Sequence, residues 1–298
     1  MKATTQLRAL LREPGMIVAP GCYDAVSGLI NRHLGFKAVY VGGSAMEASM
    51  LGHPDLGLKT LTETAAQAGR IVDATRLPVI CDAEAGFGSY ANVARTVREF
   101  EKAGVAAIHL EDQVTPPNSP NVKRRNLLSR EQAVGMVKAA LDARTDPDFV
   151  IVARSDGDEI SLDELIERCN LYLEAGADLV MPQIWRIDGR DWTGLPTEEV
   201  LAAHRRVCNA LDGKPLLGLA LPSEVNVKQI EELGYKIFLF PSDPIQAASA
   251  AVFGAMSELQ KNGSTKSYFD RNPRMDPAVY REMLRTAEWL ELEKKYAS

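Results

Sequence analysis

The sequence PVICDAEAGFG, residues 78–88, combines the end of a strand with the start of a loop. Its first four residues are apolar, as in a strand of a parallel sheet that is buried on both faces. The run stops at two acids, Asp82 and Glu84, and Gly86 and Gly88 then allow the backbone to form a tight loop. The stretch therefore predicts a buried strand whose C-terminal end carries two carboxylates.

A second stretch, AAIHLED at residues 106–112, repeats this arrangement. Its apolar run ends at Glu111 and Asp112. Carboxylates that gather at strand ends suit a hard divalent cation such as Mg2+, which keeps part of its water shell. Such acids also cap the helices that follow strands, but two pairs in one chain favour the metal.

Apolar runs alternate with helical patterns along most of the chain, and four of the runs follow a helix that ends at glycine. The strand-like runs lie within residues 16–20, 34–41, 78–82, 103–110, 149–154, 175–182, 215–221 and 233–240. The helical patterns cover residues 25–34, 61–75, 91–103, 130–143, 162–175, 197–211, 226–233 and 244–261. Strict alternation predicts a parallel sheet, and eight strands close a (β/α)8 barrel of the TIM type. A doubly wound open sheet is the alternative, but GCYDAVSG after the first strand lacks its GxGxxG turn.

The C-terminal part differs from the rest. We expect a (β/α)8 barrel catalytic domain over residues 1–262 and a linker with a helical extension over residues 263–298. A polar connector, residues 262–276, leads to one last helix over residues 277–296, which carries apolar residues such as Trp289. This helix packs either on a neighbouring subunit or on its own barrel, and the sequence leaves both open.

The composition is that of a globular protein, with 46% hydrophobic and 25% charged residues among 298. A net charge of −6 and a pI near 5.4 argue against nucleic acid or an anionic membrane as partner. They allow a small anionic substrate, because a few local cations can bind one. No apolar run approaches the ~20 residues of a membrane span, no signal-peptide pattern is seen, and the four cysteines form no CxxC pair. We therefore expect a cytoplasmic protein.

The other expected strand ends supply candidates for substrate binding. The second strand ends at Tyr40-Val-Gly-Gly-Ser44. The N–H groups of Gly42 and Gly43 and the hydroxyl of Ser44 suit a carboxylate or enolate oxygen, although a plain turn between strand and helix also uses glycines. Arg154 ends the fifth strand and needs an anion partner, for which a substrate carboxylate is the natural choice.

Motifs of several other enzyme classes are missing from the sequence. It contains no GxSxG elbow, no HExxH and no Walker loop. We interpret His33, His109 and His204 as structural or solvated, and leave the role of His53 open.

Six segments between about residues 20 and 180 carry a family resemblance: CYDAVSG, GFKAVYVGGSAMEASMLGHPDLG, LPVICDAEAGFG, VAAIHLEDQ, DPDFVIVARSD and YLEAGAD. In these segments the chain resembles the isocitrate lyase/phosphoenolpyruvate mutase superfamily. The resemblance implies a Mg2+-dependent (β/α)8 barrel, with Mn2+ as the alternative metal, in a homotetramer of paired dimers that exchange a C-terminal helix. It also implies C–C or P–C bond chemistry next to a 2-oxo or 2-hydroxy carboxylate, through an enolate held by the metal.

The resemblance also implies roles for single residues. The metal shell would consist of Asp55, Asp82, Glu84 and Glu111. Substrate binding would involve Gly42, Gly43, Ser44, Asp82 and Arg154. Catalytic roles are assigned to Arg154, Tyr40 and Ser119.

Four positions depart from the superfamily pattern. Glu84 replaces an aspartate, and a gapless alignment places Asn118-Ser119-Pro120-Asn121 where the lyases carry Lys/Arg-Cys-Gly-His. The hydroxyl of Ser119 is a much weaker acid than the thiol of that cysteine. Gln183 stands in place of a glutamate and Leu219 in place of an asparagine.

The loop over residues 115–126 is expected to be a lid that is mobile without ligand. In it, we favour a solvated face for Lys123, Arg124 and Arg125 over a role as local positive charge in the closed site. The favoured function is Mg2+-dependent cleavage of a C–C bond in a small 2-oxo or 2-hydroxy dicarboxylate, such as oxaloacetate or a substituted malate. The rivals are P–C bond chemistry on phosphonopyruvate or phosphoenolpyruvate, and a catalytically idle barrel that binds a metabolite.

Overall fold

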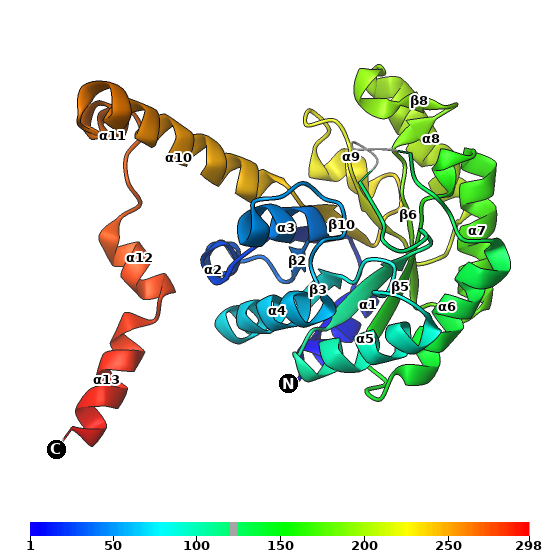
Figure 1. The fold of residues 1–298 in the computed structure, drawn as a ribbon, viewed down its shortest axis with the longest axis horizontal. Coiled ribbons are helices and arrows are strands. Elements are labelled where there is room, and N and C mark those ends of the chain that lie inside the picture. Colours follow the sequence, from blue (N-terminus) through cyan, green and yellow to red (C-terminus); the bar gives the residue numbers. More distant parts are fainter. Residues whose placement is uncertain (120–123, 298) are drawn as a thin grey trace.

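The computed structural model describes residues 1–119 and 124–297, and its parallel strands form a closed barrel (Figure 1). One sheet has the order β2-β3-β4-β5-β6 and the other the order β1-β10-β9. Parallel bridges from Gly21 to Tyr40 and from Val180 to Leu216 join the two sheets at both edges. The barrel strands are β1 (Ile17–Pro20), β2 (Val39–Val41), β3 (Val79–Asp82), β4 (Ala107–Glu111), β5 (Val150–Ser155), β6 (Leu179–Pro182), β9 (Leu217–Leu219) and β10 (Ile237–Phe240). The predicted (β/α)8 barrel is thus confirmed.

Helices surround this barrel, and their first residues explain where they begin. Asp24, Thr60, Ser89 and Ser129 each form a reciprocal capping box at a helix start. The surrounding helices are α2 (Ala25–His33), α4 (Leu61–Thr75), α5 (Tyr90–Lys102), α6 (Arg130–Ala143), α7 (Leu162–Glu174), α8 (Thr197–Ala210) and α9 (Val227–Glu231). Each begins and ends within two residues of the prediction, because polar caps and glycine stops are local signals.

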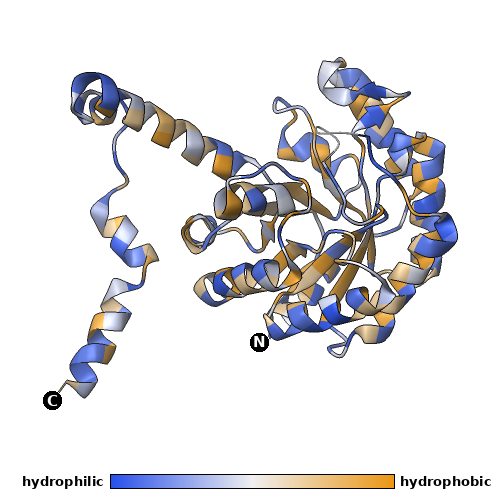
Figure 2. Ribbon diagram, in the orientation of Figure 1, coloured by the Kyte–Doolittle hydropathy of each residue, from blue (hydrophilic) through white to orange (hydrophobic). Residues whose placement is uncertain are grey.

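The barrel interior is apolar. Figure 2 shows the strands as an apolar centre, with polar residues on the outer helices. Side chains such as Ile80, Val152 and Met181 fill the interior. Helix α1 (Ala3–Arg12) packs against the same cluster through the fully buried Leu7. The C-terminal ends of the strands lie at the opposite end of the barrel from α1, and the candidate site lies there.

Two elements near the strand ends were not predicted. Helix α3 (Gly43–Leu51) follows β2 and buries the polar Glu47 beside Ala45 and Met46, so it shows no clean apolar stripe. After β6, the short antiparallel strands β7 (Arg186–Ile187) and β8 (Arg190–Asp191) form a hairpin. Each of these strands has two residues, which is too short for an alternating pattern. A 3-10 turn, η2 (Trp192–Gly194), directly follows β8 in the sequence. A second 3-10 turn, η1 (Gly157–Glu159), follows β5 and contacts β7 in space.

The C-terminal part leaves the barrel. Helix α10 (Asp243–Asn262) points away from it and exposes apolar residues such as Phe253 (Figure 1). The connector contains a short helix, α11 (Lys266–Arg271), and the single last helix that was predicted is divided into α12 (Pro277–Met283) and α13 (Thr286–Tyr296). Arg285 has a φ of 57° at the break, a left-handed conformation that a continuous helix excludes. The division of the chain after residue 262 stays a prediction. Among the described residues, no helix combines the length and the apolar character needed to cross a membrane.

Candidate active site

A cavity of about 140 Å³ lies at the C-terminal ends of the barrel strands. All ten residues assigned from the sequence line it: Tyr40, Gly42, Gly43, Ser44, Asp55, Asp82, Glu84, Glu111, Ser119 and Arg154. A larger hollow of about 950 Å³ lies at the other end of the barrel, beside α1, and contains none of these residues. The structure thus brings the assigned residues together, while their roles in binding and catalysis stay predictions.

The turn from β2 into α3 passes very close to the acids of β3. The N–H of Gly43 donates a hydrogen bond to Asp82 Oδ2 at 3.1 Å. A Cβ on Gly43 would lie 2.7 Å from Asp82 Oδ2 and 2.8 Å from Glu84 Oε1, so any side chain here would displace these two carboxylate oxygens. Glycine therefore allows this close approach without displacing the acids, and one of the two predicted amide donors, the N–H of Gly43, is already used by Asp82.

Glu84 is directed into the site by an unusual backbone conformation. Its φ is 52°, in the left-handed region that costs a non-glycine residue about 1–3 kcal/mol. Two hydrogen bonds hold it there: its N–H donates to Asp82 Oδ1 at 2.9 Å, and its carbonyl accepts from the N–H of Glu111 at 3.0 Å. Such strain is typical of functional positions.

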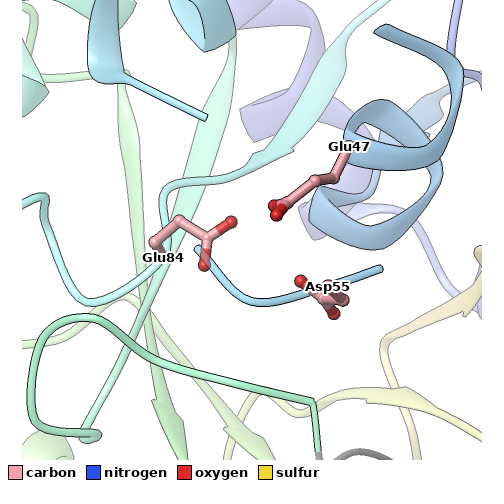
Figure 3. Close-up of side chains that lie close together, drawn as sticks. All are labelled: Glu47, Asp55 and Glu84. Atoms are coloured by element: carbon pink, nitrogen blue, oxygen red, sulfur yellow. The ribbon is translucent and has the colours of Figure 1, made fainter. Parts of the chain in front are cut away.

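Three carboxylates, from Glu47, Asp55 and Glu84, bring oxygen atoms within 4.8 Å of one another (Figure 3). Glu47 comes from α3, Asp55 from the loop after it, and Glu84 from the end of β3. An all-oxygen donor set of this kind suits Mg2+. Two of the four predicted metal ligands belong to this group, and Glu47 was missed because helical position alone does not mark an inward acid.

The other predicted ligands have different neighbours. Asp82 accepts the two backbone hydrogen bonds described above, and Glu111 Oε2 pairs with Arg154 Nη1 at 2.7 Å. Asp112, the second acid of its strand end, accepts from Tyr172 Oη at 2.6 Å and Arg168 Nη1 at 3.1 Å. Asp112 therefore contacts helix α7 and does not line the cavity.

Lys59 was also missed. Its side chain is completely buried, and its ammonium group forms ion pairs with Glu84 and, at 3.2 Å, with Glu47. In the sequence it precedes the helix cap Thr60, where a lysine reads as an ordinary exposed residue. Only the approach of α3 and β3 reveals its position.

Arg154 has two anionic partners inside the protein. Besides Glu111, its Nη2 contacts Asp156 Oδ1 at 3.0 Å, and the same oxygen accepts from Arg125 Nη1 at 2.7 Å. Among the described residues, Arg154 Nε has no hydrogen-bond partner although it is buried. The two ion pairs thus fix the orientation of the guanidinium group, and its Nε–H can still donate a hydrogen bond to a ligand.

Arg125 fastens the end of the loop after β4. It is 2% exposed, and besides Asp156 it contacts Asp158 at 2.9 Å and Glu159 at 3.1 Å. The solvated position predicted for Arg125 is therefore wrong, because three buried acids far along the chain surround it. Arg124 is exposed, as predicted, and Lys123 lies outside the described residues, as do Pro120 and Asn121.

Asp158 also holds the hairpin after β6. Its Oδ2 accepts hydrogen bonds from the N–H of Trp185 at 2.6 Å and of Arg186 at 2.8 Å. Trp185 lines the cavity and lies against Trp192, with ring centroids 5.8 Å apart. One buried carboxylate thus secures the loop end at Arg125 and the tryptophan at the cavity.

The wall formed by strands β6 and β9 is less polar than the acidic side. Gln183, Trp185 and Leu219 line the cavity there. Gln183 is 2% exposed, and within the described part of the chain its Oε1 lacks a hydrogen-bond partner. A buried amide oxygen without a partner is costly, so it marks a place where a ligand can donate a hydrogen bond.

Tyr40 is linked to a histidine that was interpreted as structural. Tyr40 Oη and His109 Nε2 are 2.8 Å apart, and His109 Nδ1 lies 3.7 Å from Asp82 Oδ1. Burial raises the pKa of Tyr40 and lowers the pKa of His109. The phenol therefore stays protonated and the imidazole uncharged at neutral pH. His109 lies between two residues assigned to the site, which its place inside a strand did not indicate.

Burial also governs the acids. Together with the charge of Asp82, it raises the pKa of Glu84 to about 7 and that of Asp55 to about 6. Burial opposes the ionisation of Asp82 as well, but His109, Lys59 and Arg154 lower its pKa. Asp82 therefore stays ionised while its neighbours exchange protons near neutrality.

Comparisons with known proteins agree with this geometry. The phosphoenolpyruvate phosphomutase family profile matches residues 7–260. The 2,3-dimethylmalate lyase of Eubacterium barkeri is 40% identical over 273 residues, which cover 91% of this chain and 90% of that protein. The chloroplastic carboxyvinyl-carboxyphosphonate phosphorylmutase of Arabidopsis thaliana is 33% identical over 299 residues, 99% of this chain and 85% of that protein.

Among solved structures, oxaloacetate acetylhydrolase in complex with the inhibitor 3,3-difluorooxalacetate matches with a TM-score of 0.87 at 27% identity. The match covers 100% of this chain and 98% of that one. The profile spans the whole barrel with its strand-end acids, and both relatives match almost the full chain. This chain therefore belongs to the phosphoenolpyruvate phosphomutase family, within the isocitrate lyase/PEP mutase superfamily.

Proposed function

We propose that this protein is a Mg2+-dependent lyase that cleaves a C–C bond of a small 2-oxo or 2-hydroxy dicarboxylate through an enolate. One observation carries the proposal: the carboxylates of Asp55, Asp82, Glu84 and Glu111 line the same cavity as a rigid arginine, Arg154. The cluster suits a dication, and the arginine suits a carboxylate of the substrate. Relatives named as acting on 2,3-dimethylmalate and oxaloacetate support this class of substrate.

The metal would be held by Asp82, which stays ionised, together with Asp55 and Glu84, with Glu111 and Glu47 nearby. Mn2+ would suit the same oxygen donors. When bound, a dication supplies Lewis-acid polarisation of the C2 oxygen and stabilises the negative charge of an enolate.

The chain's own groups would bind and orient the substrate. Arg154, Gly42 and Ser44 would hold the carboxylate next to C2, with Gly43 in the same turn donating its N–H to Asp82, and the substrate would displace water from them. Gln183 Oε1 would accept a hydrogen bond from a substrate hydroxyl. Leu219 and Trp185 would contact an apolar substituent, so we expect substituted malates or oxaloacetates to be favoured over a more polar tricarboxylate.

Proton transfers follow from the protonation states. Cleavage of a 2-hydroxy acid requires transfer of the hydroxyl proton to a base, and Glu84, a cavity carboxylate with a pKa of about 7, would accept it. As the C2–C3 bond breaks, C2 becomes a carbonyl and the electron pair of the broken bond forms the enolate on the C3 fragment. Protonation at carbon completes the reaction. For oxaloacetate itself, CO2 leaves instead and the enolate of pyruvate is protonated. Tyr40, protonated and hydrogen bonded to His109, would donate a hydrogen bond to the developing oxyanion. Ser119 is a weak acid, so water is expected to supply the final proton.

The test compares turnover of oxaloacetate, 2,3-dimethylmalate, methylisocitrate and phosphonopyruvate with Mg2+ and with EDTA. The proposal predicts Mg2+-dependent turnover of one of the first two and little of the others. Preferred turnover of phosphonopyruvate would establish P–C chemistry, which the similarity to a phosphorylmutase makes the second candidate. Turnover of none would indicate a barrel that only binds a metabolite. Asp82→Ala must abolish Mg2+ binding in calorimetry while the circular dichroism of the barrel is retained.

We also propose a homotetramer in which the C-terminal helices pack on neighbouring subunits. The support is the apolar surface of the segment that leaves the barrel: Phe253 on α10 is 76% exposed, and Trp289 on α13 is 61% exposed. Large apolar side chains exposed on a segment that leaves the domain are typical of interfaces. Light scattering coupled to size-exclusion chromatography tests this, and a monomer at micromolar concentration would contradict it. The cytoplasmic location stays a prediction from the sequence.

A further inference from the structure

Lys59 approaches the acidic cluster from within the protein. The residue is 3% exposed and does not line the cavity, whereas Glu84, its nearest partner, does. Its Nζ would lie 3.1 Å from a Cβ on Gly43, so it lies directly beneath the turn at the cavity wall. From this position the ammonium group contacts carboxylates but is separated from any bound substrate.

Lys59 forms ion pairs with only two of the four carboxylates in this part of the site, Glu47 and Glu84. Glu47 receives Lys59 at Oε2, and its Oε1 accepts the N–H groups of Leu56 at 3.2 Å and Leu58 at 3.0 Å. Lys59 thus serves Glu47 and Glu84. Among the described residues, Asp55 and Asp82 form no ion pair with a lysine or arginine. Glu47 and Glu84 therefore have a permanent counter-ion in Lys59, whereas no lysine or arginine among the described residues pairs with Asp55 or Asp82.

We propose that Lys59 is a fixed counter-ion of the metal site, a positioning residue that keeps Glu47 and Glu84 in place without metal and weakens the binding of a divalent cation. This inference rests on the proposed function, because it takes the cluster as the Mg2+ site. Like charges a few ångströms apart in a site of low dielectric repel strongly, so an ammonium ion beside Glu84 reduces the attraction for a second cation. Without Lys59, three buried carboxylates, Glu47, Asp82 and Glu84, and the half-buried Asp55 would repel one another in the metal-free protein.

Two simpler roles for Lys59 differ from the counter-ion role, one in the position it needs and the other in the metal affinity it predicts. A proton donor or a substrate ligand must reach the cavity, and Lys59 is not among its lining residues. A lysine that only fills space would leave metal affinity unchanged when replaced by a side chain of similar length. The counter-ion role is the one that couples Lys59 to the metal.

The experiment measures Mg2+ binding directly, without turnover. The protein is stripped with EDTA, and the Mg2+ dissociation constant is determined by calorimetry at about pH 8, where free carboxylates are ionised. The variants are Lys59→Met, which keeps the length but removes charge and hydrogen bonds, and Lys59→Gln, which keeps a donor but not the charge. The matched control is Lys102→Met, since Lys102 pairs with Glu99 on the surface with a 71% exposed side chain. Thermal midpoints are recorded with EDTA and with Mg2+.

We expect both Lys59 variants to bind Mg2+ at least about tenfold more tightly than the natural protein. Their melting temperature should be lower in EDTA, and Mg2+ should raise it by more than it does for the natural protein. Lys102→Met should change none of these quantities. If Lys59→Met fails to fold in EDTA, Lys59→Gln carries the comparison, and rescue of Lys59→Met by Mg2+ supports the inference.

Equal or weaker Mg2+ affinity in both Lys59 variants would overturn the inference while leaving the metal site intact. Failure of both the natural protein and the Lys59 variants to bind Mg2+ would overturn the inference together with the metal in the proposed function. Binding by the variants but not by the natural protein would support the inference in its strongest form. The two failures are therefore distinguishable.

Discussion

Gly43→Ala is expected to damage the site far more than the fold. The new Cβ would lie 2.7 Å from Asp82 Oδ2, which must retreat by about 0.7 Å to reach the 3.4 Å of an ordinary contact. Glu84 Oε1, at 2.8 Å, must move almost as far. Both atoms are the ends of side chains, so the backbone can stay in place. The site, however, is built from these oxygens.

The magnitudes of the two effects differ. Weakening the hydrogen bond from the N–H of Gly43 to the charged Asp82 costs about 1.5–3 kcal/mol. Alanine at the start of α3 recovers up to about 1 kcal/mol through its helix propensity. The free energy of unfolding should therefore fall by about 0.5–3 kcal/mol. A misplacement near 1 Å at a reacting centre costs about 10²-fold, so kcat/KM should fall by about 10- to 100-fold and Mg2+ should bind more weakly.

Urea denaturation, Mg2+ calorimetry and steady-state kinetics on the best substrate provide the three readouts. Gly194→Ala is the matched control, because a Cβ there meets no atom within 4 Å. Natural Mg2+ affinity together with natural kcat/KM in Gly43→Ala would refute the close-packed geometry. A loss of stability much above 3 kcal/mol would show that the turn belongs to the folding core instead.

Three further predictions concern protons and charges. The pKa values of about 6 for Asp55 and about 7 for Glu84 are above those of free acids, so the metal-free protein should lose stability as the pH rises from about 4 to about 7. The affinity for Mg2+ should increase over the same range, because the ionised carboxylates bind the metal. An Mg2+ affinity that is flat between pH 5 and 8 in calorimetry would contradict this. Ser119→Ala should change kcat by less than about tenfold, since loss of a true general acid typically costs 10²–10⁴-fold, and a collapse of activity would show that Ser119 is that acid. Arg125→Met should lower the free energy of unfolding by about 3–5 kcal/mol, because it leaves buried acids unpaired, and a loss below 1 kcal/mol in urea denaturation would argue against the ion-pair network.

The sequence predicted the barrel and the residues around the cavity because both depend on local signals. An apolar run that stops at an acid or an arginine marks a strand end, and parallel strand ends meet at one mouth of a barrel. These signals identify Asp82, Glu84, Glu111 and Arg154, all of which line the cavity.

Partners that are distant in the sequence could not be read in this way. Lys59 lies 12 residues from Glu47 and 25 from Glu84, and Arg125 lies 31 residues from Asp156. Each of these basic residues is buried by its partners, and no local pattern separates it from a solvated one. Glu47 was hidden for the same reason, as a polar residue in a helix without an apolar stripe.

The shared anchor at Asp158 has a consequence for how this site can evolve. The same carboxylate holds Arg125, at the end of the loop after β4, and the backbone at Trp185, where the hairpin after β6 begins. A substitution that shifts one segment alters the anchor of the other, so changes in the two should be epistatic, with effects that do not add. Libraries that vary one loop at a time would miss combinations that work only together. Engineering this enzyme for a new substrate therefore requires that both segments are varied together while Asp158 is kept constant.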